Sequence, residues 1–334
     1  MLTRILLWLW LAGLALSASV SAQTAKPNYD VPLHGHGQYI ATPQGRLYYE
    51  REGQGPPVVL IAGGPGGSHA SFHPWFSRLA PSHTVIYFDN LGRGRSGRLA
   101  DPKGYTVERD ADDIESLRRA LGFKTITVLG HSYGGMPALA YALKYPQHTD
   151  HLILSDTLHS ADGFQQNIDN CNREAATRFP EIWEKLTAMR ARGVKTGSDA
   201  YENLYGMATD DLYWYNPENA AKLYHSGDKA DRLNFDIYLA MIGDDPEWTV
   251  GGTMKGYDPR PQMKTLRVPT LICVGRFDRV ALPKVAQEIK DALPPQSARL
   301  VIFEHSGHRP WVEETDRYFQ TVTAFLDGEP DAQK

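Results

Sequence analysis

Cysteine is scarce in this sequence of 334 residues, which holds Cys171, Cys273 and no third cysteine. Two cysteines exclude a fold stapled by several disulfides, and a single bridge between them is possible but not implied. No group of Cys and His has the spacing of a metal site, so neither a metal nor a cofactor is expected. The net charge of −4 comes without a long basic run, which argues against a nucleic-acid partner.

Long apolar runs are also missing, except at the N-terminus. Residues 5–16 are almost wholly apolar, the basic Arg4 precedes them, and small residues lead up to Ala22. This pattern predicts a signal peptide over residues 1–22, and therefore a periplasmic or secreted protein. An uncleaved anchor is the alternative. No later stretch reaches the ~20 apolar residues of a membrane helix, so no stable membrane span is expected after cleavage.

The remaining chain alternates between strand-like and helix-like segments. Short apolar or β-branched runs bounded by Gly, Pro and Asp indicate strands, and a 3.6-residue periodicity between them indicates helices. Such alternation predicts an α/β fold with a mostly parallel sheet flanked by helices. The predicted strands are residues 38–42, 46–51, 57–62, 84–88, 125–129, 151–155, 269–274 and 299–303, and the predicted helices are residues 107–121, 136–145, 283–293 and 313–326.

The alternation stops between residues 160 and 262. This stretch has helical periodicity in places, shows no clear strand, and is rich in Tyr and Trp, including Trp183, Trp214 and Trp248. We therefore predict a helical cap over residues 160–262, inserted between two parts of one core at residues 23–159 and 263–334. Single aromatic residues usually pack helices together, but as a group these side chains also suit an apolar pocket wall.

Residues 130–134 read Gly-His-Ser-Tyr-Gly and match the G-x-S-x-G pattern of a nucleophile elbow. A predicted buried strand precedes the pattern and a predicted helix follows it, as an elbow requires. The strained turn needs small neighbours, which Gly130, Gly134 and Gly135 supply. Ser132 is therefore the predicted nucleophile. It needs a base to remove its proton and a carboxylate to orient that base.

Two loops later in the chain hold candidates for the acid and the base. In folds with this elbow the chain order is Ser, acid, His. Asp278 and His308 each follow a predicted strand, and the carboxyl ends of parallel strands share one edge of a sheet. The predicted catalytic triad is therefore Ser132, Asp278 and His308. His305 is an alternative to His308, and Asp156 is an alternative to Asp278.

Attack on an ester or amide also creates an oxyanion, which preorganised N–H groups must stabilise. The backbone N–H of Tyr133, beside the nucleophile, is one predicted donor. The other is Gly64, in the loop Gly-Gly-Pro-Gly-Gly that follows strand 57–62. A phosphate-binding turn is the alternative for this loop, but such a turn would end in Lys-Ser or Lys-Thr.

These motifs resemble those of the α/β-hydrolase superfamily and, more narrowly, of the proline iminopeptidase group of serine peptidases. That group carries a His-Gly-Gly-Pro-Gly loop, an Asp-Gln-Arg-Gly-x-Gly-x-Ser segment and a Gly-x-Ser-x-Gly-Gly elbow. The counterparts here are residues 62–66, 89–96 and 130–135, with Ala62 in place of His and Asn-Leu in place of Gln-Arg.

The resemblance also implies carboxylates that capture the free α-amino group of the substrate. In some members one of them follows the catalytic Asp directly, and the residue at that position here is the cation Arg279. The candidates that remain in the predicted cap are Glu174, Glu181, Glu202, Asp210, Asp211, Asp244, Asp245 and Glu247.

We expect a serine hydrolase that works through an acyl-enzyme and releases N-terminal proline, or another small residue, from short peptides. A carboxylesterase or lactonase acting on small esters is the alternative, because Arg279 would repel an ammonium group and could attract a carboxylate. A non-catalytic binding protein on the same fold is a third hypothesis, and the intact Ser, Asp and His argue against it. Dehalogenases and epoxide hydrolases would have Asp at the elbow, so Ser132 disfavours both.

Overall fold

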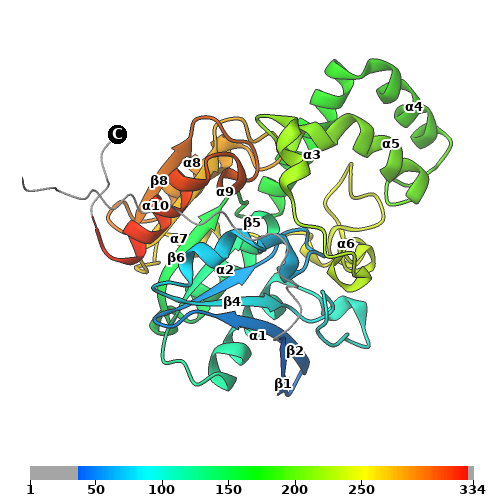
Figure 1. Ribbon diagram of the computed structural model, residues 1–334. Helices are drawn as coiled ribbons and strands as arrows, with labels where there is room; N and C mark the ends of the chain where they lie inside the picture. The colour runs from blue at the N-terminus through cyan, green and yellow to red at the C-terminus, as the bar shows by residue number, and fades with distance from the viewer. Residues whose placement is uncertain (1–36, 330–334) are drawn as a thin grey trace, which may run out of the picture.

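The computed structural model describes residues 37–329, so the predicted signal peptide lies outside the described part of the chain. Its centre is one sheet with the strand order β1-β2-β4-β3-β5-β6-β7-β8, in which β1, β2 and β4 pair antiparallel and all later pairs are parallel (Figure 1). The predicted mostly parallel sheet is thereby confirmed. The strands are β1 Gln38–Thr42, β2 Gly45–Glu52, β3 Pro57–Ile61, β4 Thr84–Asp89, β5 Ile126–His131, β6 Thr149–Ser155, β7 Thr270–Gly275 and β8 Ala298–Phe303.

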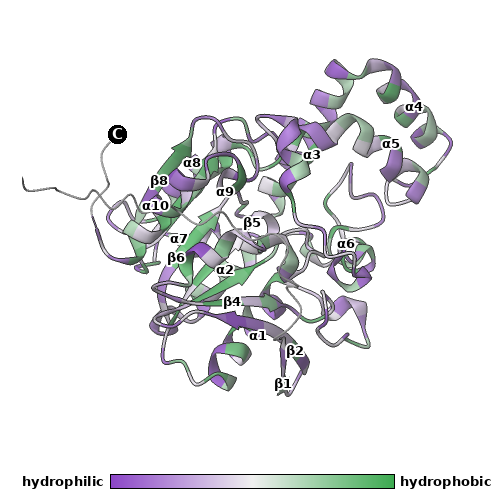
Figure 2. Cartoon of the chain, viewed as in Figure 1, coloured by the Kyte–Doolittle hydropathy of each residue, from purple (hydrophilic) through white to green (hydrophobic). Residues whose placement is uncertain are grey.

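Alternating side chains of the central strands pack on opposite faces of this sheet. On β3, Val58 and Leu60 belong to one hydrophobic cluster, whereas Val59 and Ile61 belong to another. Because the side-chain period of a strand is two, one apolar run can supply both layers. Figure 2 shows the hydrophobic colour concentrated on these strands. Full burial of each such side chain is worth about 1.5–3 kcal/mol.

Helices cover both faces, as the alternation predicts. Helices α1, α2 and α8 pack on one face, and α9 and α10 pack on the other. On α1 the buried residues Val107, Ala111, Ile114 and Leu117 form one stripe at helical spacing, and Thr106 caps the first turn. The helices are α1 Val107–Ala120, α2 Gly135–Lys144, α3 Ala161–Arg178, α4 Pro180–Ala191, α5 Asp199–Thr209, α6 Phe235–Ile242, α7 Arg260–Met263, α8 Pro283–Ala292, α9 Pro310–Glu313 and α10 Thr315–Leu326.

The predicted helix at 313–326 corresponds to α10, which begins at Thr315, whereas Glu313 ends the short helix α9 and Glu314 separates the two. The backbone of Glu314 is not helical, with φ −122° and ψ 52°. Its carboxylate accepts hydrogen bonds from the backbone N–H of His305 and the hydroxyl of Ser306, at 2.8 and 2.7 Å. The break between α9 and α10 therefore lies where Glu314 contacts the loop after β8. Sequence periodicity cannot predict such a contact.

Residues 161–242 form the helices α3 to α6 and contain no strand. Helices α3, α4 and α5 pack on one another around Leu186, Tyr201 and Tyr205. In Figure 1, α4 and α5 (green) extend away from the sheet. We call residues 160–262 the cap. This cluster is separate from those of the sheet, so the outer cap helices have a small core of their own.

None of the helices in the described residues is long and apolar enough to cross a membrane. Both cysteines are free. Cys273 is buried in the middle of β7, as its apolar surroundings predict, whereas Cys171 lies on α3. The possible disulfide between them is therefore not formed.

Candidate active site

Ser132 follows the last residue of β5 at a sharp turn into α2. Its φ of +55° lies in the left-handed region, which costs free energy in a residue other than glycine. The positions on either side of this turn have no room for a side chain, so they must be glycine. A Cβ on Gly130 would lie 2.3 Å from the carbonyl oxygen of Gly134, and one on Gly134 would lie 2.2 Å from that of Ile61. The turn therefore has the strained backbone of a nucleophile elbow.

Asp278 and His308 come together at the same edge of the sheet. Oδ2 of Asp278 lies 2.8 Å from Nδ1 of His308, and both side chains are buried. The other carboxylate oxygen accepts hydrogen bonds from the backbone N–H groups of Val280 and Ala281, both at 2.8 Å. Asp278 is thus fixed by its own loop, and it can hold the His308 ring with Nε2 free to act as a base.

The loops after β5 and β8 are joined beside Ser132. Nε2 of His131, the residue before Ser132, lies 3.0 Å from the backbone oxygen of His308, and the two rings are 4.6 Å apart. Burial, reinforced by the neighbouring His308, lowers the pKa of His131 well below its ordinary value. His131 is therefore a neutral donor that links the nucleophile turn to the loop of the base.

The two alternative residues have other surroundings. His305 is exposed, and its ring lies 5.7 Å from that of Tyr215 on the surface. Asp156 is fully buried at the end of β6, where Oδ1 accepts from the backbone N–H of Gly275 at 2.8 Å and Oδ2 from the hydroxyl of Ser155 at 3.0 Å. Burial, and then the charge of Asp278, raise the pKa of Asp156 well above its ordinary value. A neutral Asp156 is suited to support Asp278 rather than to replace it.

The glycine-rich loop after β3 approaches the nucleophile closely. A Cβ on Gly63 would lie 2.8 Å from Cβ of Ser132 and 3.3 Å from its Oγ. Gly64 has φ +123°, a conformation that favours glycine. A side chain on either residue would thus either crowd the serine or strain the loop. Gly63 thus brings the loop against Ser132, and the predicted oxyanion donors Gly64 and Tyr133 are the chain neighbours of these two residues.

A buried ion pair connects the glycine-rich loop with Tyr133, and the motifs alone did not indicate it. The guanidinium of Arg93 donates to both carboxylate oxygens of Asp110 at 2.8 Å and, through Nε, to the backbone oxygen of Pro65 at 2.8 Å. The hydroxyl of Tyr133 donates to Oδ2 of Asp110 at 2.6 Å. The Arg93–Asp110 pair therefore ties the glycine-rich loop to the residue after the nucleophile.

Comparisons with known proteins agree with this geometry. Residues 56–315 match the family model described as the alpha/beta hydrolase fold. The chain is similar to a proline iminopeptidase of Saccharolobus solfataricus, with 33% identity over 84% of this chain and 87% of that protein. Among solved structures it is similar to a proline iminopeptidase of Mycobacterium smegmatis (TM-score 0.70, 22% identity, 87% and 98% of the two chains) and a thermophilic esterase of Thermogutta terrifontis (TM-score 0.61, 23% identity, 87% and 98%).

The chain belongs to the α/β-hydrolase fold family. Its strand order explains how this hydrolase assembles a site from distant segments. The parallel strands β3, β5, β6, β7 and β8 are consecutive in the sheet, so the loops after them open on one edge. Those loops carry Gly64, Ser132, Asp156, Asp278 and His308 in that order.

Most carboxylates of the hydrolase's cap are exposed or already paired with a cation. Glu181 and Asp210 are exposed. Four others form ion pairs: Glu174 with Arg279 at 3.9 Å, Asp211 with Arg178 at 3.7 Å, Asp244 with Lys195 at 3.5 Å and Asp245 with Arg190 at 2.6 Å. Of the candidates implied by the resemblance, Glu202 and Glu247 remain.

Glu202 and Glu247 form a partly buried acidic pair on the inner side of the cap. Burial and the charge of Glu247 raise the pKa of Glu202 to about 8, and its Oε1 is buried without a hydrogen-bond partner. Burial raises the pKa of Glu247 to about 7, although the hydroxyl of Tyr238 donates to Oε1 at 3.1 Å. Neither has a cationic partner within the described residues 37–329. The pair therefore lacks a cationic counter-charge, and a bound cation would favour its ionised form.

Tyr213 relates this acidic pair to the triad. Its ring lies 5.3 Å from that of His308, and its backbone oxygen accepts from the backbone N–H of His308 at 2.8 Å. Burial raises the pKa of its hydroxyl, and Glu247 is among the charges that add to the rise. Tyr213 thus contacts His308, the predicted base, and also feels the charge of Glu247.

Arg279 is already engaged by other groups, so it is not positioned as a free cation for a substrate carboxylate, as the esterase hypothesis required. Its guanidinium is 3.9 Å from Glu174 and donates to the backbone oxygen of Trp214 at 3.3 Å. Its own backbone oxygen accepts from the side chain of Asn170 at 2.8 Å. These contacts fasten the loop of Asp278 to the cap. The charge of Arg279 is therefore engaged with the cap.

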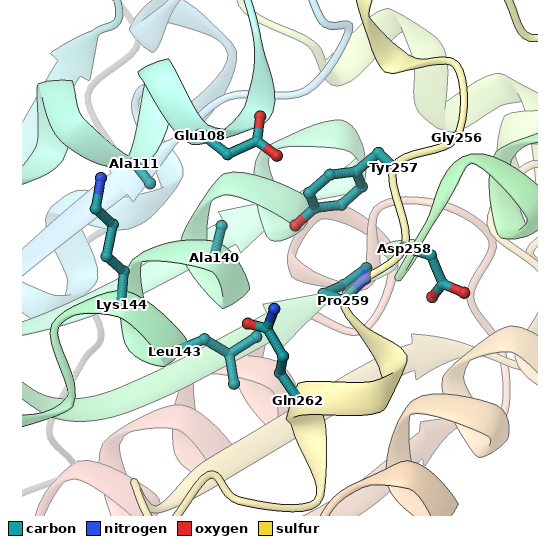
Figure 3. Close-up of a pocket in the computed structure, with 10 residues that line it drawn as sticks. All are labelled: Glu108, Ala111, Ala140, Leu143, Lys144, Gly256, Tyr257, Asp258, Pro259 and Gln262. Atoms are coloured by element: carbon teal, nitrogen blue, oxygen red, sulfur yellow. The ribbon is translucent and has the colours of Figure 1, made fainter.

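A cavity of about 360 Å³ lies elsewhere, between α1, α2 and the segment before α7 (Figure 3). Figure 3 shows Glu108, Lys144 and Gln262 around it, with the ring of Tyr257 directed toward its centre. None of the predicted triad or oxyanion residues lines it. Its lining on α1, α2 and residues 256–262 therefore separates it from the candidate active site.

Proposed function

We propose that this serine hydrolase is an aminopeptidase that releases N-terminal proline, or another small residue, from short peptides. The observation that carries the proposal is the buried Glu202–Glu247 pair, which has no cationic partner among the described residues, because a free N-terminal ammonium is a cation that would pair with its ionised form. Similarity to proline iminopeptidases over most of the chain supports the same substrate class.

In the proposed first step, Oγ of Ser132 attacks the carbonyl carbon of the first residue. His308 removes the hydroxyl proton, and Asp278 stabilises the imidazolium that forms. The backbone N–H groups of Tyr133 and Gly64 stabilise the oxyanion, each worth about 3 kcal/mol. The intermediate then collapses, the C–N bond breaks, and His308 returns the proton to the departing amine of the shortened peptide.

In the second step, water replaces the leaving amine. His308 removes a proton from the water, and the hydroxide attacks the acyl-enzyme carbonyl in the same oxyanion hole. The ester bond to Ser132 breaks, Oγ recovers a proton, and the free amino acid leaves. No group beyond these side chains and water is needed for the proton balance.

Substrate selection follows from the cap. The ammonium group would lie against Glu202 and Glu247, which fixes the first residue and leaves its carbonyl at Ser132. An ammonium near the pair favours the ionised carboxylates, so binding offsets the burial that raises their pKa values. A blocked amine would lose this interaction and would leave the carboxylates without a partner.

The test compares the purified protein with Ser132→Ala on three substrates: a proline arylamide, its N-blocked form and a short-chain nitrophenyl ester. We expect rapid cleavage of the free-amine arylamide, little cleavage of the blocked form, and a loss of about 10⁴-fold or more in the variant. Equal cleavage of free and blocked arylamides would contradict the proposed amine recognition.

A carboxylesterase or lactonase is the second candidate, since one solved structure of similar fold is named an esterase. It predicts turnover of the nitrophenyl ester with no cleavage of either arylamide. Because Arg279 is engaged with Glu174 and Trp214, its charge offers this candidate less support than its place in the sequence suggested.

We also propose that the protein is exported, on the basis of the signal-peptide pattern over residues 1–22. Expression in a Gram-negative host should then yield periplasmic protein whose N-terminal residue is Gln23. Full-length protein in the cytosol, or retention in the membrane fraction, would argue against cleavage at that position.

A further inference from the structure

A second cluster of chemically active side chains lies on the other side of the glycine-rich loop. Glu50 on β2, His69 and His73 place one ligand atom each within 4.8 Å of one another. His69 begins the short 3-10 helix η1 (His69–Phe72), and His73 follows its end. All three side chains are buried, with 8%, 0% and 6% of their surfaces exposed.

We propose that Glu50, His69 and His73 form a structural binding site for one divalent transition-metal ion of the zinc class. No metal site was expected from the sequence, because the spacing of His69 and His73 alone is not distinctive. The third ligand, Glu50, lies on β2, and only the folded structure brings it next to the two histidines.

Two of the contacts between the ligand groups have lengths close to those in such a site. Nε2 of His69 is 3.1 Å from Oε1 of Glu50, and Nε2 of His73 is 3.1 Å from Oε2. In a tetrahedral site with metal–ligand bonds of about 2.0–2.1 Å, neighbouring ligand atoms are about 3.3 Å apart. The three groups could therefore hold an ion with small side-chain movements. Two imidazoles and a carboxylate are ligands that suit zinc and neighbouring metals.

The groups around the ligands are those that orient metal-binding histidines. Nδ1 of His69 lies 2.9 and 3.0 Å from the carboxylate oxygens of Asp89, which is the arrangement that directs Nε2 at an ion. The ring of His73 stacks on Tyr87 with centroids 3.9 Å apart. The hydroxyl of Tyr48 donates to Oε1 of Glu50 at 2.6 Å. Every proposed ligand is thus held in place by a second group.

Charge also favours a divalent cation. Glu50 and Asp89 bring two carboxylates into a region where Glu50, His69 and Asp89 are all buried. An ion of charge +2 between neutral imidazoles balances both carboxylates, which reduces the cost of burying them.

The competing explanation is a network bridged by protons instead of an ion. Burial would lower the pKa of His69, but Asp89 and Glu50 raise it to about 10. A metal must therefore displace a proton from this ring. Both explanations join η1 and the glycine-rich loop to β2 and β4, and uptake of metal distinguishes them.

The experiment uses the purified full chain without an affinity tag, stripped with EDTA and dialysed against a limited excess of Zn²⁺ or Co²⁺. We expect one equivalent of metal per chain, visible d–d absorption from bound Co²⁺, and a rise in Tm of about 5 °C at saturating Zn²⁺. Absence of stoichiometric uptake would overturn the site.

Two variants test whether the ion binds at these three residues. His73→Phe keeps a ring to stack on Tyr87 but has no ligand atom, and Glu50→Gln keeps the size of the side chain. In each we expect uptake and the Zn²⁺-dependent rise in Tm to disappear, with near-UV circular dichroism confirming the fold. His225→Asn, at an exposed histidine, and a His34→Asn, His36→Asn double variant should bind like the original protein. Unchanged uptake in His73→Phe would assign the ion to another site.

Discussion

At the scale of single residues, the site depends on which of two buried carboxylates touches the base. Asp278 accepts from His308, whereas Asp156 accepts from the backbone of Gly275 and from Ser155. Both follow parallel strands at the same edge, so the sequence alone left the choice open. The hydrogen bonds assign the proposed orienting role to Asp278 and a supporting role to Asp156.

Substitution of each carboxylate by its amide should separate these roles. Asp278→Asn is expected to lower kcat by about 10³–10⁴-fold, because an amide cannot stabilise the imidazolium or hold its tautomer. Asp156→Asn is expected to lower kcat by less than about tenfold, because the amide oxygen still accepts one of the two hydrogen bonds. Steady-state kinetics on the proline arylamide provide the measurement. The reverse order of effects would make Asp156 the catalytic acid.

The hydroxyl of Tyr133 is a second feature that can be isolated at this scale. Tyr133→Phe removes its hydrogen bond to Asp110 and leaves the backbone N–H and the ring in place. We expect kcat to fall about tenfold with KM nearly unchanged, because the proposed oxyanion donor loses its anchor. Tyr141→Phe is the matched control, since that buried hydroxyl also bonds to a carboxylate, Glu115, away from the site. Equal kinetic effects in both variants would reduce the role of Tyr133 to stability.

At the scale of elements, the core strands follow from the sequence and the cap does not. The apolar runs before Ser132 and Asp278 are long enough to cross a buried sheet, so strand type and loop position were predictable. The cap residues pack in a small separate cluster and show mixed periodicity, which gave no individual helix boundaries. Contacts such as Arg93 with Asp110, or Glu202 with Glu247, join segments distant in the chain, so no local pattern could report them.

The acidic pair of the cap provides the test at this scale. In Glu202→Gln and Glu247→Gln, KM for the free-amine arylamide should rise about tenfold or more, because a charge-assisted hydrogen bond to the ammonium is lost. The nitrophenyl ester, which has no amine, should be turned over as before. Glu181→Gln, at an exposed glutamate of α4, serves as the control. Loss of ester turnover in the same proportion would indicate damage to the cap instead of lost recognition.

At the scale of the whole molecule, the glycine-rich loop and the segment after it link the candidate active site to the proposed metal cluster. One side of the glycine-rich loop meets the nucleophile, and on the other side the segment that follows it enters the proposed metal cluster at His69. The cap reaches the edge of the sheet that carries the candidate active site, because the backbone oxygen of Tyr213 accepts from His308 and the backbone N–H of Asn234 donates to the oxygen of Gly66. Glu202 and Glu247 of the cap and Asp113 of α1 keep protons near neutral pH that they would release on unfolding, which couples stability to pH.

That coupling predicts lower thermal stability at alkaline pH. Burial, with repulsion from Asp110, raises the pKa of Asp113 to about 7, and burial likewise raises those of Glu247 and Glu202 to about 7 and about 8. The pKa of an unfolded carboxyl group is about 4, so the folded state binds more protons between these values. The resulting stability is complete below the unfolded pKa and is lost as pH rises through the folded pKa. Tm should therefore fall by on the order of 5 °C from pH 6 to pH 9.

Calorimetry across this range is the measurement, and Glu202→Gln combined with Asp113→Asn should flatten the profile. A Tm that stays level or rises toward pH 9 in the original protein would show that these carboxyl groups are ionised in the folded state.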